Sequence, residues 1–220
     1  MSKIKLYRYT SISKWAIENL VEGILYLNPL TNMNDFYEFA FSCTYDESYG
    51  SHVHKLDNRL NDRLCHDNLL NEIGVCCLTE IFNSKAMWGH YGDNFKGMCI
   101  EYEFDLEQYP NLHKVIYGDL PYNVHFEKLG LSKYDTLLCN CYNICSYKHY
   151  EWEYEREWRF IGKPKTDIDV KSSIRAIYFG SRSDGNKINN LMRKVRDKGR
   201  IKYYYCSPKF NSYEFEIRTF

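Results

Sequence analysis

The chain has 220 residues, and its 29 basic and 29 acidic side chains give a formal net charge of zero. This balance gives no overall electrostatic footprint for nucleic acid, and the one basic run, Arg193 to Lys202, is typical of the solvated face of a late helix and its exit. With 44% hydrophobic residues the sequence can fill a core, which excludes a disordered chain.

The N-terminus carries no signal-peptide pattern, and no window is apolar for long enough to span a bilayer. We therefore expect a cytoplasmic protein with no membrane partner. The length and the absence of a low-complexity linker predict a single domain over residues 1–220.

The first third of the chain predicts a strand, a helix and a second strand. Ile4–Thr10 is rich in Tyr and predicts the first strand, after which Ser11 or Ser13 can cap a helix that ends at Gly23. Ile24–Leu27 predicts the second strand, stopped by Asn28-Pro29. Leucines at near-helical intervals then predict a helical excursion over about residues 51–72.

The remaining elements alternate between strands and helices. Val75–Thr79 and Gly97–Phe104 predict strands on either side of a short helix capped by Ser84, and a helical middle region follows over residues 126–147. The later predictions are strands at Glu155–Ile161, Ile174–Phe179 and Ile201–Cys206, a helix around Ile188 to Val195, and an edge strand in the tail at Tyr213–Arg218. This order predicts an α+β fold with a mixed, mostly antiparallel sheet and helical insertions.

A candidate site lies in the segment Lys148 to Arg159, where aromatic rings alternate with ionisable groups. On a strand, Glu155, Glu157 and Arg159 would share one face. Two carboxylates that point the same way need cations beside them or a polar cleft in front of them. The alternative is a surface strand edged with mixed charge, where ion pairs contribute little.

A second candidate segment, Ser84 to Gly97, contains Trp88, His90 and Tyr91. The two large rings either face a ligand or pack in the core against a short amphipathic helix. His90 is either a general base or a hydrogen-bonded structural residue, and we favour the structural interpretation.

Nine cysteines are an odd count and indicate buried thiols in a reducing compartment. Cys139, Cys141, Cys145 and His149 form a C-x-C-x3-C-x3-H pattern that can bind zinc, but no second ligand pair with C-x2-C spacing accompanies it. We therefore assign no metal.

Several segments together resemble the bacterial domain-of-unknown-function 2971 family over nearly the whole chain. They are LYRYTSI, the ILYLNP strand with NDFYE after it, MWGHYGDNFKGMCIEYE, and the K-x3-W-x2-E-x-E-x-R pattern from Lys148 to Arg159. The family name implies no activity.

The order of elements also resembles, more distantly, the ADP-ribosyltransferase fold. The resemblance lies in Arg8-Tyr9-Thr10 before a helix that ends in Gly, in Thr79, Ser84 and Tyr91 in a later strand and short helix, and in Glu155-Arg156-Glu157 on a late strand. It implies NAD as substrate, bound between the first strand and the Glu155 to Arg159 strand. The implied NAD-binding residues are Arg8, Thr10, Ser84, Trp88 and Tyr91.

In this interpretation Glu157 stabilises positive charge on the ribose and accepts the proton of a nucleophile. Glu155 orients the acceptor, and Arg159 keeps both carboxylates ionised. Arg8 holds a ribose hydroxyl or the pyrophosphate, and Tyr91 or Trp88 stacks on nicotinamide. Arg8 can equally pair with one of the Glu residues without touching a ligand.

The implied function is ADP-ribosyltransferase or NAD glycohydrolase activity, in a bacterial toxin or in antiphage defence or counter-defence, with a protein or nucleic-acid acceptor. We expect Glu157→Gln to abolish turnover and leave folding intact. Two alternatives are a non-enzymatic binding module for a protein or a nucleotide signal, and a metal-dependent nucleic-acid enzyme that uses Glu155, Glu157 and His90.

Overall fold

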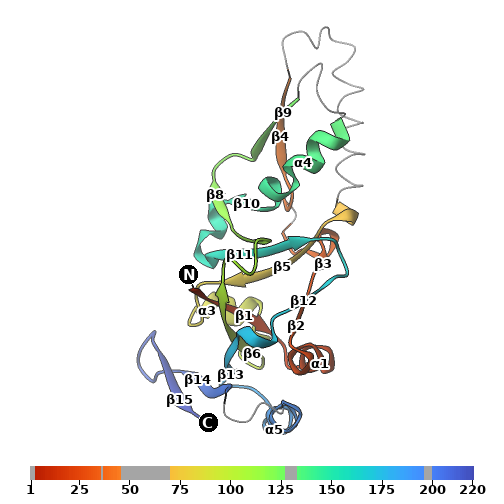
Figure 1. The fold of residues 1–220 in the computed structure, drawn as a ribbon. Helices are drawn as coiled ribbons and strands as arrows, with labels where there is room; N and C mark the ends of the chain where they lie inside the picture. The colour runs from red at the N-terminus through yellow and green to blue at the C-terminus, as the bar shows by residue number, and fades with distance from the viewer. Residues whose placement is uncertain (1–2, 36, 46–69, 127–132, 196–199) are drawn as a thin grey trace.

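The computed structural model describes residues 3–35, 37–45, 70–126, 133–195 and 200–220 (Figure 1). Its centre is a nine-stranded sheet in the order β15-β14-β13-β6-β1-β5-β11-β7, with β3 paired to β5 beside this path. Within this sheet, and among the described residues, only β13 and β14 are parallel neighbours, so the α+β class with a mixed, mostly antiparallel sheet is confirmed. The strands of this sheet are β1 Lys3–Thr10, β3 Asn28–Pro29, β5 Gly74–Thr79, β6 Met98–Asp105, β7 Leu112–Lys114, β11 Glu157–Gly162, β13 Ile174–Gly180, β14 Lys202–Pro208 and β15 Phe215–Thr219.

Outside this sheet, the described residues form three further strand pairs. They are β10 Tyr147–His149 with β8 Ile116–Gly118, β12 Asp167–Asp169 with β2 Ile24–Tyr26, and β4 Phe41–Tyr45 with β9 Tyr122–Phe126. The helices are α1 Lys14–Glu22, α3 Lys85–His90, α4 Lys133–Cys145 and α5 Gly185–Lys194, with short 3-10 turns η1 Leu30–Asn32, η2 Tyr150–Glu155 and η3 Lys171–Ser173. None of the helices that the structure describes is long and apolar enough to cross a membrane.

Local sequence explains the helix ends. The Ser13 side chain accepts a hydrogen bond from the Ala16 backbone N–H and begins α1, and Gly23 ends it in the left-handed conformation at φ 77°. The Ser84 hydroxyl begins α3 in the same way, and the Asp184 carboxylate begins α5. The Ser13 and Ser84 caps lie where the sequence predicts a helix start.

The hydrophobic interior has three parts. The largest packs α1 and α5 against β1, β6, β11 and β13 through Leu6, Ile17, Ile100, Phe160 and Leu191. A second cluster joins α4 to β4 and β9, and a third surrounds Trp88. Figure 1 shows α4, β4 and β9 beyond one side of the sheet, with α1 and α5 at the opposite end of the molecule.

Two sequence predictions are corrected here. The region 126–147 is helical only from residue 133 to 145 among its described residues, because Phe126 ends β9 and Tyr147 begins β10. The strand predicted from Glu155 begins at Glu157, since Glu155 belongs to η2 and Arg156 turns the chain at φ 43°. The helical excursion over about residues 51–72 lies outside the described residues except for its end, where residues 70–72 are helical.

The strands β1 and β5 diverge, and this divergence positions the site. Their ladder contains one pair, Tyr7 with Thr79, and Thr79 pairs in turn with Glu157 of β11. A continued ladder would pair Arg8 and Tyr9 with the next residues of β5. These pairs do not form. The sheet therefore opens between β1 and β5 while β1 stays fully paired to β6.

Two glycines provide a test of local packing. A Cβ on Gly97 would lie 2.3 Å from the Thr10 carbonyl oxygen and 2.8 Å from the Gly92 carbonyl oxygen, both rigid backbone atoms, whereas a Cβ on Gly89 in α3 would meet nothing within 4 Å. We expect Gly97→Ala to reduce the free energy of unfolding by about 1–3 kcal/mol. Gly89→Ala should raise it by roughly 0.5–1 kcal/mol because it removes backbone freedom from the unfolded chain. Urea denaturation of both variants checks this, and equal effects would contradict the packing at Gly97.

Candidate functional site

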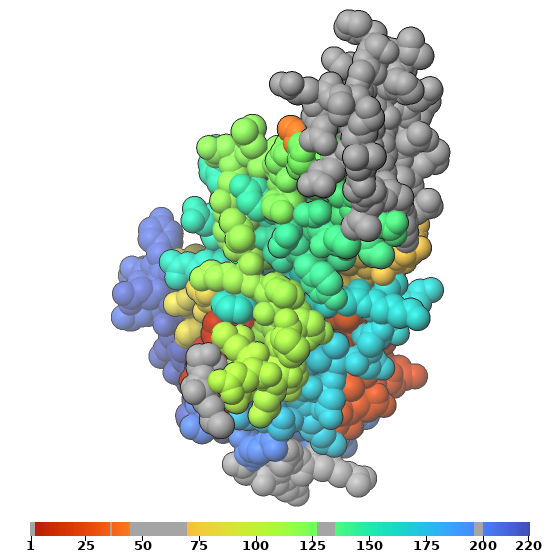
Figure 2. Space-filling view, turned by 45° about the horizontal axis from the view of Figure 1, so that its top comes forward, coloured from red at the N-terminus to blue at the C-terminus, as the bar shows by residue number. Residues whose placement is uncertain are grey.

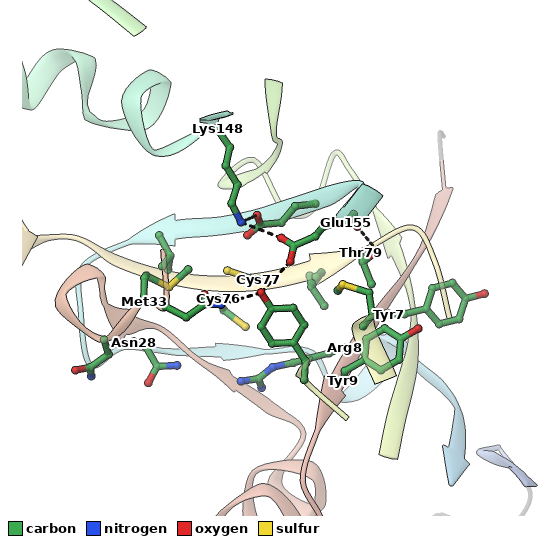
Figure 3. Close-up of a pocket in the computed structure, with 17 residues that line it drawn as sticks. Tyr7, Arg8, Tyr9, Asn28, Met33, Cys76, Cys77, Thr79, Lys148 and Glu155 are labelled. Atoms are coloured by element: carbon green, nitrogen blue, oxygen red, sulfur yellow. Dashed lines mark hydrogen bonds and ion pairs between the residues drawn. The ribbon is translucent and has the colours of Figure 1, made fainter. Parts of the chain in front are cut away.

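A cavity of about 290 Å³ occupies the opening between β1 and β5. Figure 3 shows Arg8 and Asn28 toward one side of it and Lys148 with Glu155 on the other. Its lining residues come from β1, η1 and its flanks, β5, α3, β10, η2 and β11: Tyr7, Arg8, Tyr9, Asn28, Asn32, Met33, Asn34, Val75, Cys76, Cys77, Leu78, Thr79, Met87, Tyr91, Lys148, Glu155 and Glu157.

The acidic side of the cavity is built by the turn between η2 and β11. Because Arg156 takes a left-handed conformation, Glu155 and Glu157 do not project from one strand as the alternation predicts. They converge through Lys148 instead, whose Nζ lies 2.8 Å from Glu155 Oε2 and 3.1 Å from Glu157 Oε2. All three side chains are buried, so this wall is not a solvated charged surface.

Arg159 is fully buried and binds both Glu157 and Glu38. Its contacts complete one buried network of ion pairs, which consists of Glu38, Lys148, Glu155, Glu157 and Arg159. Its Nε donates to Glu157 Oε1 at 2.8 Å, its guanidinium also binds both carboxylate oxygens of Glu38, and Nη1 donates to the Cys145 carbonyl. Arg159 does not line the cavity. It therefore acts on the site through Glu157 and cannot contact a ligand there.

Glu157 is the more saturated of the two carboxylates. Its oxygens accept from Arg159 and Lys148, and the Cys77 thiol donates to it as well. Burial would raise its pKa, but the charges of Arg159 and Lys148 outweigh this and lower the pKa to about 2. The Glu157 carboxylate is therefore ionised and a very weak base.

Glu155 has more capacity left for a ligand. Its Oε1 accepts from the Tyr91 hydroxyl at 2.8 Å and its Oε2 from Lys148. Each oxygen retains a lone pair, since a carboxylate can accept about four hydrogen bonds. Burial and the neighbouring Glu155 charge both raise the pKa of Tyr91, so its hydroxyl stays protonated as the donor.

The buried network carries a net charge. The carboxylates of Glu38, Glu155 and Glu157 face the cations Lys148 and Arg159, so one negative charge remains when all are ionised. Burial disfavours the Lys148 cation, but Glu157 and Glu155 raise its pKa overall and keep it charged. Glu38 does not line the cavity, so at the cavity this network presents the carboxylates of Glu155 and Glu157 with the Lys148 cation between them.

The other side of the cavity is rich in donors. In the described part of the chain the Arg8 guanidinium has neither an ion pair nor a hydrogen-bond partner, so the alternative in which it pairs with one of the Glu residues is wrong. Asn28 lies on this side too (Figure 3), and Asn32 is also part of the cavity lining. Arg8 also borders a small cavity with Asn19, whose buried Nδ2 has no hydrogen-bond partner among the described residues. Unused donors of this kind favour an anionic or oxygen-rich ligand.

The structure thus brings together four of the predicted site residues, Arg8, Tyr91, Glu155 and Glu157, and Thr79, which belongs to the same resemblance, lines the cavity as well. Trp88 is a correction, because it is 0% exposed, stacks on Phe95 and donates to the Phe82 carbonyl, which leaves no face for a ligand. Ser84 and Thr10 also lie outside the cavity lining, Ser84 because it caps α3 and Thr10 because it borders the small cavity instead.

Two residues of the buried network, Lys148 and Glu38, were not predicted as site residues from the sequence. Lys148 opens the K-x3-W-x2-E-x-E-x-R pattern and Glu38 ends the NDFYE stretch, so both lie in segments that carry the family resemblance. Neither could be assigned to the network without the fold, because Glu38 and Arg159 are 121 positions apart.

The structure does not assemble either metal arrangement considered in the sequence. His90 is exposed at the end of α3 and does not line the cavity, so it does not join Glu155 and Glu157. Cys139 is exposed while Cys141 and Cys145 are buried, and no three His, Cys, Asp or Glu side chains of the described residues gather as a metal site.

The lowered pKa of Glu157 predicts a pH-dependent loss of stability. Its carboxylate has a lower pKa in the folded than in the unfolded protein, so its contribution is complete above about pH 4.5 and is lost as the pH falls toward 2. We expect this group to contribute about 3 kcal/mol, measured as the difference in acid sensitivity between the protein and Glu157→Gln in urea titrations from pH 6 to pH 2.5. Identical pH dependence in the two proteins would contradict the assigned ion pairs.

Comparison with known proteins adds one finding. The family described as "Protein of unknown function (DUF2971)" matches residues 87–160, a segment that runs from α3 through β11 and contains Tyr91, Lys148, Glu155, Glu157 and Arg159. No curated protein and no solved structure matches the chain. The chain is therefore similar to this family over the segment that builds the acidic side of the cavity.

Proposed function

We propose that this protein binds NAD in the cavity between β1 and β5 and breaks its nicotinamide–ribose bond, as an ADP-ribosyltransferase or NAD glycohydrolase. One observation supports this most strongly. Arg8, Tyr91, Glu155 and Glu157, which the resemblance to ADP-ribosyltransferases singled out in three distant segments, line the same cavity. The toxin, antiphage or counter-defence setting, and a protein or nucleic-acid acceptor, follow from the same resemblance and are part of the proposal.

The chemistry of the two sides suits the two halves of the ligand. Arg8, with Asn28 and Asn32, offers donors to a phosphate, and guanidinium binds phosphate by two parallel hydrogen bonds. Glu155 faces the same space from the opposite side and can accept from a ribose hydroxyl. At about 290 Å³ the cavity is at the small end of ligand sites, so it takes the nicotinamide ribose and a phosphate while the adenosine extends outward.

The proposed step breaks the C–N bond between ribose and nicotinamide. The electron pair stays with the ring nitrogen, so nicotinamide leaves neutral and positive charge develops on the ribose. The carboxylates of Glu155 and Glu157 line the cavity, and in this proposal they lie beside that ribose and stabilise its charge. Water or an acceptor then forms a bond to the ribose carbon and gives its proton to a carboxylate.

The geometry changes which carboxylate takes the proton. Glu157 is saturated by its partners and its pKa of about 2 makes it a poor base, whereas Glu155 keeps free lone pairs toward the cavity. We therefore assign proton acceptance to Glu155 and electrostatic stabilisation to Glu157. Tyr91 lies beside Glu155 and is the one large ring of the pair Trp88 and Tyr91 that can contact nicotinamide.

Arg8→Met tests the ligand assignment. Because Arg8 makes no ion pair in the described part of the chain, the variant should unfold at nearly the same urea concentration as the natural protein. Its affinity for NAD should fall by about 10- to 100-fold through the lost charge-assisted hydrogen bonds, measured by isothermal titration calorimetry. Lys3→Met is the control, since Lys3 lies on the same strand but is exposed and pairs with Glu103. Equal affinities in the two variants would remove Arg8 from the site.

The second candidate is a binding module that takes a nucleotide without converting it. It is favoured by the fact that every carboxylate of the network already has cationic partners. Titration with NAD combined with detection of free nicotinamide separates the two functions. Binding without nicotinamide release would support the module.

A further inference from the structure

The strand β15 ends the central sheet, and no other described strand pairs with its outer edge. Among the described residues it pairs with β14 alone, and Figures 1 and 2 show the segment from β14 to the C-terminus projecting from the body of the molecule. An unpaired edge is a template for another strand unless it is covered, bulged or shortened. Ile217 is 41% exposed on this strand, and Phe220 beyond it is 57% exposed.

The hydrogen bonds within the hairpin determine which backbone groups face outward. The Lys209 N–H donates to the Glu214 carbonyl and the Phe220 N–H donates to the Tyr203 carbonyl. In this register the even-numbered residues of β15 direct their backbone N–H and C=O groups toward β14. In an antiparallel ladder the intervening residues point their N–H and C=O groups away from that partner. The outward donors and acceptors of β15 therefore belong to Phe215, Ile217 and Thr219.

The side chains of β15 are complementary to themselves in one register. In an antiparallel pair of two β15 strands centred on Ile217, Ile217 meets Ile217 of the second copy, and Phe215 meets Thr219 of the second copy. These are the residues with outward backbone groups, so each such pair exchanges two hydrogen bonds. Glu216 and Arg218 pair with each other within the strand at 2.8 Å, and in this register each also faces the opposite charge on the second copy, at the closely spaced positions where side chains approach most.

We propose that β15 pairs with β15 of a second copy about a two-fold axis at Ile217, joining the two sheets into one. This register pairs residues whose backbone N–H and C=O groups both point outward, and it places Glu216 opposite Arg218. A shift by one residue would pair a residue with outward backbone groups with one whose groups already bind β14. Because β14, β13 and β6 separate β15 from β1, the pairing leaves the cavity open. It is independent of the proposed function.

Charge-reversal variants test the register. Arg218→Glu has two acidic residues at these positions and Glu216→Arg has two basic ones, so each should weaken self-association about tenfold or more in sedimentation velocity runs over a concentration series. An equimolar mixture of the two variants should form dimers again, and so should the double variant Glu216→Arg with Arg218→Glu. Dimers that persist unchanged in either single variant, or a mixture that stays monomeric, would overturn the register.

Ile217→Pro tests the backbone pairing. Proline removes an N–H that faces outward and leaves the bonds to β14 in place, so the variant should keep the circular dichroism of the natural protein and become monomeric. Natural protein that is monomeric at every concentration, or an Ile217→Pro variant that dimerises as well as the natural protein, would overturn the proposal.

Discussion

Replacing Arg159 by Met should reduce the free energy of unfolding by about 3–5 kcal/mol, the largest loss of stability that we expect from a single substitution here. The guanidinium is 0% exposed and binds Glu38, Glu157 and the Cys145 carbonyl, so its removal leaves two buried carboxylates without their main counter-charge. Urea denaturation at pH 7 measures this loss of stability.

Arg175→Met is the matched control. Arg175 lies on β13, its side chain is 33% exposed, and its ion pair with Glu103 is open to solvent. Such pairs contribute about 0–1 kcal/mol, so this variant should unfold close to the natural protein. If both arginine variants lose the same stability, the buried network does not have the energetic role assigned to it.

Glu155→Gln should lower kcat for nicotinamide release by about 10²- to 10⁴-fold, the largest effect on activity that we expect. Glutamine keeps the shape of the side chain and can accept from Lys148, but it cannot take a proton from a nucleophile. Lys148 keeps Glu157 as a partner, so the loss of stability should be small. Steady-state assays with NAD give kcat, and urea denaturation of the same samples shows whether the variant is folded.

Two further variants make this result interpretable. Glu103→Gln changes a solvent-accessible carboxylate on β6 outside the cavity and should leave kcat unchanged. Glu157→Gln removes a buried partner of both Arg159 and Lys148, so the sequence-based expectation of intact folding is revised to a loss of about 3 kcal/mol. Full activity in Glu155→Gln would refute its role as the proton acceptor.

The elements that were predicted well have strong local signals. The first strand, the helix from Ser13 to Gly23 and the strand after Gly97 are set by alternation and by capping residues that act within a few positions. The short strands around residues 112–126 and 147–149 were missed because they pair with segments far along the chain and are too short to show a period. Tertiary contacts decide such segments.

The sequence allowed several residues of the site to be predicted, but not how their side chains are arranged in space. The residue types at Arg8, Tyr91 and Glu155 pointed to a common cavity through the order of elements alone. The left-handed turn at Arg156, the bridge made by Lys148 and the distant anchor Glu38 depend on how three separate segments meet. Trp88 is a residue type that often stacks on ligands, but here its ring packs against Phe95 and Tyr9 in the core.

A crystal structure with a non-hydrolysable NAD analogue tests the central claim most directly. We predict that the analogue occupies the opening between β1 and β5, with a phosphate oxygen within hydrogen-bond distance of the Arg8 guanidinium and a hydroxyl of the nicotinamide ribose on Glu155. Density for the analogue elsewhere on the molecule, or an empty cavity at a saturating concentration of the analogue, would contradict it.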